Sequence, residues 1–430
     1  MIIRSVYRNI TIRKSKYSIA IVCSCLFALI SFNTEAQSDV KIDSLRNELS
    51  VTKDKQVRIA LLDQLGEEYS LLKHDSLYVV GEELMLAADE INDPCSKSTG
   101  YFYMGNYFYQ NSEISEALEY YKKSLEIRKS NCKAEKIASA LVQVGNMYGH
   151  LGEYEKAYSC YFQSLHLYEN KEDWNNVSSV YSNLGILDVE REQFASAFNN
   201  YSLALKYEVK SEQSDSVNLG NIYNNFGGLY EIQGVYDTAI FYFQKAMNIY
   251  QLIDHKSGLA HGYNNIGIVY YYDGKEDSTM SYFMRSLEIR KELGDDRNTS
   301  QSYNNIGILY MYEENYPMAI AYADSSLEMA KKGGYKEEVS EALFNKYEIY
   351  FNWGEYYDAT INLKEYSEYK DSLVADESER SINVLNAKYE TVKKEKELQE
   401  KNIAIKQHEA AGKRKNLIIG AAIIIALLLA

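Results

Sequence analysis

A phrase of about eight residues recurs at a nearly fixed spacing, and this period constrains the fold more than any other feature of the chain. The copies read LDQLGEEY, YFYMGNYF, LVQVGNMY, YSNLGILD, YNNFGGLY, YNNIGIVY, YNNIGILY and LFNKYEIY. Their anchors lie 39 to 42 residues apart and define repeats 1 to 8: Gly66, Gly105, Gly145, Gly185, Gly227, Gly267, Gly307 and Tyr347. Such a period is typical of proteins in which each repeat packs only on its neighbours.

The spacing inside each repeat is helical. In repeat 5, for example, the anchor Gly227 is followed by Tyr230, Ala239 and Phe243, and a turn containing Gly234 separates the two halves. Each repeat is therefore predicted to be a helical hairpin, which buries its apolar face only by stacking on the next hairpin. The chain has 430 residues and only 2 Pro, so a β-sandwich, a collagen-like fibre and a low-complexity chain are excluded.

This pattern resembles the tetratricopeptide repeat, and the resemblance covers about Ser44 to Asp376. It implies an all-α fold, a right-handed α-solenoid of stacked hairpins. The period of about 40 residues exceeds the usual 34 or so, and no Pro closes the repeats. Both features are similar to the long repeats of kinesin light chains and bacterial peptide-sensing regulators. Thr279 replaces the small Ala of repeat 6 and Tyr347 replaces the Gly of repeat 8, so we expect looser packing there.

Asparagines recur just before the anchors. They occupy the second or third position before the anchor in five successive repeats: Asn183, Asn224, Asn225, Asn264, Asn265, Asn304, Asn305 and Asn345. Two residues turn a helix by roughly 200°, so we expect these side chains to point away from the packing face and to form a ladder along an inner groove.

Amides at these positions can pair with the backbone of an extended peptide, and the resemblance implies such a role. The alternative is that they only bond the neighbouring helix. Because repeats 2 and 3 carry Tyr103 and Gln143 at the second position before the anchor, the peptide track is expected in repeats 4 to 8.

The net charge and the absence of catalytic motifs limit the ligands and activities to be expected. The formal net charge is -15, and residues 37–376 carry 31 basic against 53 acidic residues, or -22. We expect a neutral or basic ligand and no direct nucleic-acid binding. Cys95 and Cys132 fall in equivalent loops and are candidates for a disulfide. No catalytic, cofactor or metal-ligand motif stands out, so no enzyme is expected within these residues; a kinase domain beyond residue 430 stays open.

The two ends predict a membrane topology. Residues 1–36 are typical of a signal peptide, with an uncleaved anchor as the alternative. Residues 37–376 form the solenoid, and 377–416 a connector helix that could pair two copies as a coiled coil. The uncharged run 417–430 reads as the start of a transmembrane helix, and we expect the sequence to continue beyond it. The basic cluster 413–415 would then lie outside, against the positive-inside tendency.

This order of segments resembles bacterial membrane sensors in which a periplasmic tetratricopeptide region precedes a histidine kinase or a helix-turn-helix regulator. The resemblance implies a sensor in the inner membrane whose periplasmic repeats bind a peptide or protein. The alternative is a membrane-anchored scaffold for envelope assembly without signalling output.

Overall fold

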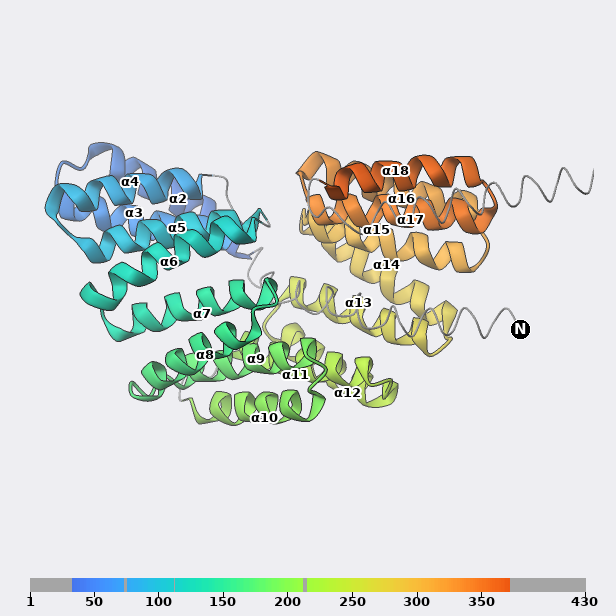
Figure 1. Ribbon diagram of the computed structural model, residues 1–430, viewed down its shortest axis with the longest axis horizontal. Helices are drawn as coiled ribbons and strands as arrows, with labels where there is room; N and C mark the ends of the chain where they lie inside the picture. The colour runs from blue at the N-terminus through green and yellow to red at the C-terminus, as the bar shows by residue number, and fades with distance from the viewer. Residues whose placement is uncertain (1–32, 73–75, 112, 212–214, 372–430) are drawn as a thin grey trace, which may run out of the picture. The chain divides into compact units, whose positions relative to one another are not determined.

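The computed structural model describes residues 33–371, apart from 73–75, 112 and 212–214, and every regular element in these ranges is an α-helix (Figure 1). The helices are α2 (Asn33–Val51), α3 (Lys55–Leu72), α4 (Leu77–Ile91), α5 (Pro94–Gln110), α6 (Ile114–Asn131), α7 (Ala134–His150), α8 (Tyr154–Glu169), α9 (Trp174–Glu190), α10 (Phe194–Lys210), α11 (Ser216–Ile232), α12 (Tyr236–Leu252), α13 (Lys256–Tyr272), α14 (Glu276–Glu292), α15 (Asp296–Tyr312), α16 (Tyr316–Gly333), α17 (Lys336–Trp353) and α18 (Tyr356–Asp371).

The predicted all-α repeat fold is confirmed. Helices α3 and α4 form repeat 1, and the helices then follow in pairs to α17 and α18, which form repeat 8. Helix α2 precedes the repeats and packs on α3. Residues 1–32 of the predicted signal peptide, the connector and the apolar C-terminal run lie outside the described residues. Within the part that is described, no helix has the length and apolar composition needed to cross a membrane.

The length of the helices explains the 40-residue period. Helices α11, α12, α13 and α14 each have 17 residues, and three-residue turns separate them, so one hairpin with its two turns fills 40 residues. The turn residue seven positions after the anchor has a positive φ, as in Gly234 (73°). Glu192 and Glu314 adopt the same conformation with φ of 59°. In repeats 3 to 8 this left-handed residue follows the end of the first helix.

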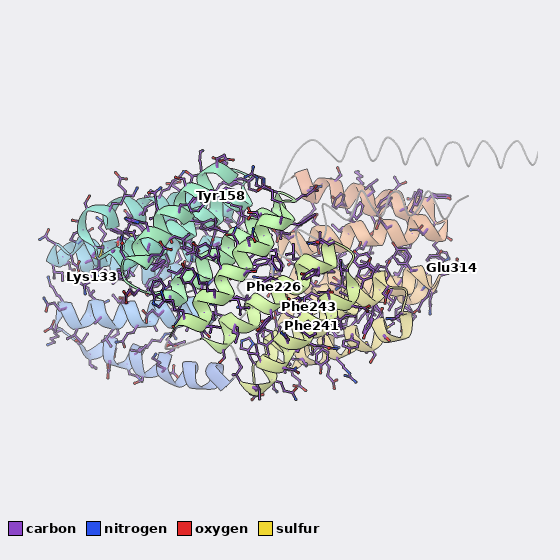
Figure 2. All side chains as sticks on the ribbon, turned by 90° about the horizontal axis from the view of Figure 1, so that it is seen from below. Lys133, Tyr158, Phe226, Phe241, Phe243 and Glu314 are labelled. Atoms are coloured by element: carbon purple, nitrogen blue, oxygen red, sulfur yellow. A yellow bond between two sulfur atoms is a disulfide. The ribbon has the colours of Figure 1, made fainter. Side chains whose placement is uncertain are left out.

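The anchor glycine is explained by the aromatic ring sixteen residues later. The ring of Phe243 packs on Gly227, and that of Phe283 on Gly267. A methyl group at Gly227 or Gly267 would lie 2.5 or 2.6 Å from the ring, so the two helices of a hairpin approach this closely only because the anchor has no side chain. Figure 2 labels Phe243. The expected looser packing of repeat 6 is not seen at Thr279, which is fully buried and donates to the Lys275 carbonyl.

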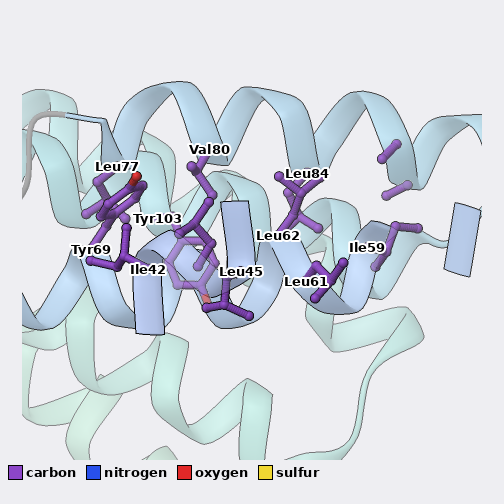
Figure 3. Packing of buried hydrophobic residues seen from close by; sticks show 13 residues of the cluster. Ile42, Leu45, Ile59, Leu61, Leu62, Tyr69, Leu77, Val80, Leu84 and Tyr103 are labelled. Atoms are coloured by element: carbon purple, nitrogen blue, oxygen red, sulfur yellow. The ribbon is translucent and has the colours of Figure 1, made fainter. Parts of the chain in front are cut away.

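The described chain divides into two compact parts. The first comprises the helices up to Ile306 together with Gly333–Tyr335, and the second comprises Gly307–Lys332 and the residues from Lys336. From α2 to α14 each helix packs on the next, and several first helices also contact the first helix of the following repeat: α3 with α5, α7 with α9, α9 with α11, and α11 with α13. Figure 3 shows the N-terminal core of this part, where Leu62 and Leu84 are fully buried. In the second part, Tyr347 of repeat 8 is half-buried.

Cys95 and Cys132, the two candidates for a disulfide, are bonded to one another. Their Cα atoms are 5.4 Å apart, and the bond ties the start of α5 to the end of α6. Cys160 is buried as a free thiol, and burial raises its pKa. The disulfide therefore closes a loop that spans one whole repeat.

Candidate ligand-binding site

The predicted site residues lie on the first helices of repeats 4 to 8. Seven of them belong to the first compact part and are called the asparagine row: Asn183 on α9, Asn224 and Asn225 on α11, Asn264 and Asn265 on α13, and Asn304 and Asn305 on α15. Because α11 contacts both α9 and α13, this row crosses from one first helix to the next.

Hydrogen bonds join the asparagine row from one repeat to the next. Asn265 Nδ2 donates to Asn224 Oδ1 at 2.9 Å, and Asn305 Nδ2 donates to Asn264 Oδ1 at 3.0 Å. In both bonds the residue two positions before an anchor donates to the residue three positions before the preceding anchor. We call each such pair a rung.

The same rung occurs without asparagine between repeats 1 and 2. Tyr103 lies two positions before its anchor, and its hydroxyl donates to Asp63 Oδ1 at 2.7 Å. Burial, reinforced by the Asp63 charge, raises the pKa of Tyr103 well above its ordinary value, so the hydroxyl keeps its proton and remains a donor. Tyr103 at this position thus couples repeats 1 and 2 as Asn265 and Asn305 couple later repeats.

Burial corrects one expectation about the asparagine row. The sequence pattern predicts side chains that point away from the packing face, but Asn225, Asn264, Asn265 and Asn304 are only 8, 6, 5 and 7% exposed. Rungs hold Asn264 and Asn265 between the first helices. Asn225 Nδ2 and Asn304 Oδ1 are buried there without a hydrogen-bond partner among the described residues. The other members are half-buried: Asn183, Asn224 and Asn305. The structure thus assigns inter-repeat bonds to part of the row, while ligand contact by its half-exposed members stays a prediction.

One rung is not closed. The register that pairs Asn265 with Asn224 would pair Asn225 of repeat 5 with Ser182 of repeat 4. Both Ser182 Oγ and Asn225 Nδ2 are buried and have no hydrogen-bond partner among the described residues. Asn183, next to Ser182, instead donates over 3.4 Å to Asn146 Oδ1. The asparagine row therefore continues from α9 to α11, but no hydrogen bond joins Asn225 to Ser182 there.

Asn345, the eighth predicted site residue, belongs to the second compact part. It is half-buried on α17, and the adjacent Lys346 Nζ forms an ion pair with Asp324 Oδ1 at 2.8 Å. The amide of Asn345 therefore lies beside a lysine whose positive charge is paired with Asp324.

The first helices before the row carry aromatic and imidazole groups. Tyr109 of α5 and His150 of α7 lie side by side, with the Tyr109 hydroxyl 3.4 Å from His150 Nε2. Within the described ranges, no group of three or more His, Cys, Asp or Glu side chains could hold a metal ion.

Sequence reasoning identifies the asparagines but misses the residues that occupy or pair with the same positions in other repeats: Asp63, Asn146 and Ser182. The signal that could have found Asp63 and Ser182 is their place three positions before an anchor, which becomes meaningful only once adjacent repeats are aligned side by side.

Comparison with known proteins agrees with this geometry. A sequence profile of the tetratricopeptide repeat matches residues 136–207, 218–292 and 258–332. No curated protein matches the chain. Among solved structures, the chain resembles a Rap protein complexed with competence and sporulation factor, with 16% identity over 79% of this chain and 98% of that chain and a TM-score of 0.53.

It also resembles the apo form of the quorum sensor NprR from B. thuringiensis, with 15% identity over 78% of this chain and 99% of that chain and a TM-score of 0.52. At these identities the likeness shows a shared fold.

Proposed function

Because the chain carries tetratricopeptide repeats, we propose that it is a binding module whose first helices hold a peptide or protein ligand. The asparagine row is the observation that carries this proposal. Each closed rung uses one N–H of the donor amide and one lone pair of the acceptor, while an amide offers two N–H groups and two lone pairs. The remaining capacity of the half-exposed members suits the alternating carbonyl and N–H groups of an extended peptide.

The structural neighbours favour a peptide ligand. The Rap protein with the same fold was solved with competence and sporulation factor, and NprR is described as a quorum sensor. The formal charge of -22 over residues 37–376 favours a neutral or basic ligand, with binding that weakens as salt rises.

We place the repeats in an oxidising compartment outside the inner membrane. The Cys95–Cys132 disulfide supports this placement, because such bonds persist in the periplasm and are rare in the reducing cytosol. The apolar runs near both ends of the sequence support membrane anchoring. The proposed role is the periplasmic sensor part of a histidine kinase or helix-turn-helix regulator, with the segment 377–416 carrying the signal and pairing two copies. The alternative is an envelope scaffold without signalling output.

The ligand can be tested with the purified full chain in detergent. The chain is incubated with an acetylated and amidated random heptapeptide library, separated from unbound peptide by gel filtration, and the retained peptides are identified by mass spectrometry. Neutral and basic peptides should be retained, and acidic ones should not. Retention of none, or of acidic peptides alone, would contradict the proposal.

A matched pair of variants locates the binding surface. Asn183→Ala removes a half-exposed amide of the asparagine row, whereas Asn248→Ala removes an exposed amide from the second helix of repeat 5. The first should weaken binding about fivefold, the loss of about one hydrogen bond, and the second should leave affinity unchanged. Equal effects of the two variants would argue against the row.

Two further experiments test the location of the repeats and whether ligand binding leads to a signal. Alkaline phosphatase fused after Asp376 should be active, because it folds only after export; an inactive fusion would place the repeats in the cytosol. Ligand-dependent transcription in cells would support the sensor, and ligand binding without any such response would support the scaffold.

A further inference from the structure

The second helices of repeats 3 to 5 share a face that borders solvent. Six side chains define this outer face: Phe162 on α8, Phe198, Lys206 and Lys210 on α10, and Phe241 and Lys245 on α12. We propose that the outer face binds the surface of a bilayer containing anionic phospholipids, with the phenylalanines among the acyl chains and the lysines on headgroup phosphates. This inference rests on the proposed membrane anchoring and does not involve the peptide ligand.

The outer face lies opposite the packed side of each helix. Helices α8, α10 and α12 each pack on the first helix of their own repeat and on that of the next. The residues twelve, sixteen and nineteen positions after each anchor are buried, as are Ala239, Phe243 and Ala246 of α12. The six residues of the outer face lie thirteen to twenty-five positions after their anchors. They fall within an arc of about 140° on the other side of the helix axis.

Three large apolar side chains on this face are exposed to water. Phe162, Phe198 and Phe241 are 58, 40 and 51% exposed, and Phe241 is labelled in Figure 2. Single apolar residues are normal on a protein surface. Phenylalanines on three neighbouring second helices, interspersed with lysines, are instead typical of a surface that contacts a protein or a membrane.

The outer face carries no acidic side chain, although the repeats as a whole are strongly acidic. Helix α10 contains one acid, Glu208, which is fully buried and accepts a hydrogen bond from the Asp215 N–H at 2.7 Å. The acids of α8 and α12 lie near the helix ends: Glu155, Glu169 and Asp237. Charges further away than about 8 Å are largely screened at physiological salt. The lysines therefore set the local potential, which attracts an anionic surface.

The lysines of the outer face are held by aromatic rings rather than by carboxylates. Lys245 Nζ lies 4.7 Å from the ring centroid of Phe241 and 5.0 Å from that of Tyr223, and Lys210 Nζ lies 3.2 Å from that of Trp174. None of the three outer-face lysines forms an ion pair with another described residue. Because a ring orients an ammonium group without neutralising its charge, these lysines remain available to phosphate oxygens.

The rest of the chain favours a bilayer as the partner. Residues 377–416, the proposed connector, lead into the apolar run 417–430, and a helix of 40 residues is about 60 Å long. Such a tether raises the effective concentration of the outer face at the membrane, so weak contacts are sufficient. Lysine, phenylalanine, tyrosine and tryptophan are also the side chains found at the interface between a bilayer and water.

A matched pair of labelled variants tests the contact in liposomes that carry the full chain. Gln244→Cys places a thiol between Phe241 and Lys245, and Gln64→Cys places one on the first helix of repeat 1; both glutamines are exposed. Each thiol receives a fluorophore in the absence of reductant, and the wild type, whose free Cys160 is buried, is the labelling blank. With phosphatidylglycerol in the bilayer, nitroxide-labelled lipid should quench the label at position 244 and leave the label at position 64 unchanged. Quenching should weaken in phosphatidylcholine alone.

The lysines are tested by changing Lys206, Lys210 and Lys245 together to Gln. Each lysine near an anionic surface contributes about fivefold in affinity, so quenching at position 244 should fall to the level at position 64. The control changes three exposed lysines elsewhere to Gln, with the same change in net charge: Lys53, Lys129 and Lys332. It should leave the quenching as it is. Should the first triple variant fail to fold, Lys206→Gln with Lys210→Gln serves instead.

The outcomes separate this inference from the proposed function. A full chain that does not float with the liposomes overturns the proposed membrane anchoring and this inference with it. A chain that floats but is quenched equally at positions 244 and 64, or equally with and without the outer-face lysines, overturns the inference alone. A label at position 244 that is shielded from water but not quenched by lipid shows that a protein covers the outer face, which also overturns the inference.

Discussion

Changing Asn225, Asn265 and Asn305 together to Ala should clearly lower the stability of the fold. The sequence pattern alone predicts that these side chains face a groove and that their removal leaves unfolding nearly unchanged. The structure reverses this expectation, because Asn265 and Asn305 donate across repeat boundaries to Asn224 and Asn264.

The size of the effect follows from the two bonds. Each lost hydrogen bond costs about 1 kcal/mol. Asn264 is only 6% exposed, so its oxygen is left unpaired in the interior at a further cost of about 1–3 kcal/mol, whereas half-exposed Asn224 regains water. Asn225 adds little, since its amide nitrogen has no partner in the described residues. The sum is about 3–5 kcal/mol.

Thermal unfolding followed by circular dichroism at 222 nm measures this loss. At about 2–4 °C per kcal/mol for a chain of this size, the midpoint should fall by about 6–20 °C. Repeat proteins can unfold in steps, so hydrogen exchange of α13 and α15 should show that the loss is centred on those helices.

The control is Asn225→Ala alone, which should shift the midpoint by less than about 3 °C, corresponding to under about 1 kcal/mol. A triple variant whose midpoint stays within about 2 °C of the wild type would refute the argument. It would mean that the rungs contribute nothing and that the amides are free to serve the ligand alone, as the sequence pattern indicates.

Further predictions concern the disulfide, the turns and pH. Loop closure over the 37-residue separation of Cys95 and Cys132 predicts a loss of about 4 kcal/mol on reduction, measured by thermal unfolding with and without reductant; the double Ser variant should not respond to reductant. Glu192→Gly should stabilise by about 1 kcal/mol and Gly234→Glu should destabilise similarly, because both positions have positive φ, and melting midpoints shifting in the opposite senses would contradict this. Burial opposes the effect, but hydrogen bonds from the first turn of α5 hold the pKa of Asp93 below its ordinary value. Its stabilisation is therefore present above about pH 4 and lost as pH falls through the lowered pKa, and Asp93→Asn should flatten the pH dependence of melting between about pH 2 and 5.

The amino-acid pattern is enough to predict the hairpins. Helical spacing and a small residue at the anchor are local properties, so the sequence by itself assigns Gly227 and Phe243 to facing helices. The glycine turn at Gly234 is equally visible. Glu192, which adopts the same left-handed conformation without being glycine, is not, because its backbone is held by the helices on either side.

Contacts between repeats cannot be predicted in the same way. The sequence places asparagines at regular positions, but whether Asn265 meets solvent or Asn224 depends on how one hairpin is offset against the next. That offset is set by the packing of whole helices, which no single repeat encodes. The period alone determined the all-α hairpin fold and its repeat length. Only the tertiary structure decided that some of the asparagines bond one another, whereas Ser182 Oγ and Asn225 Nδ2 have no partner among the described residues.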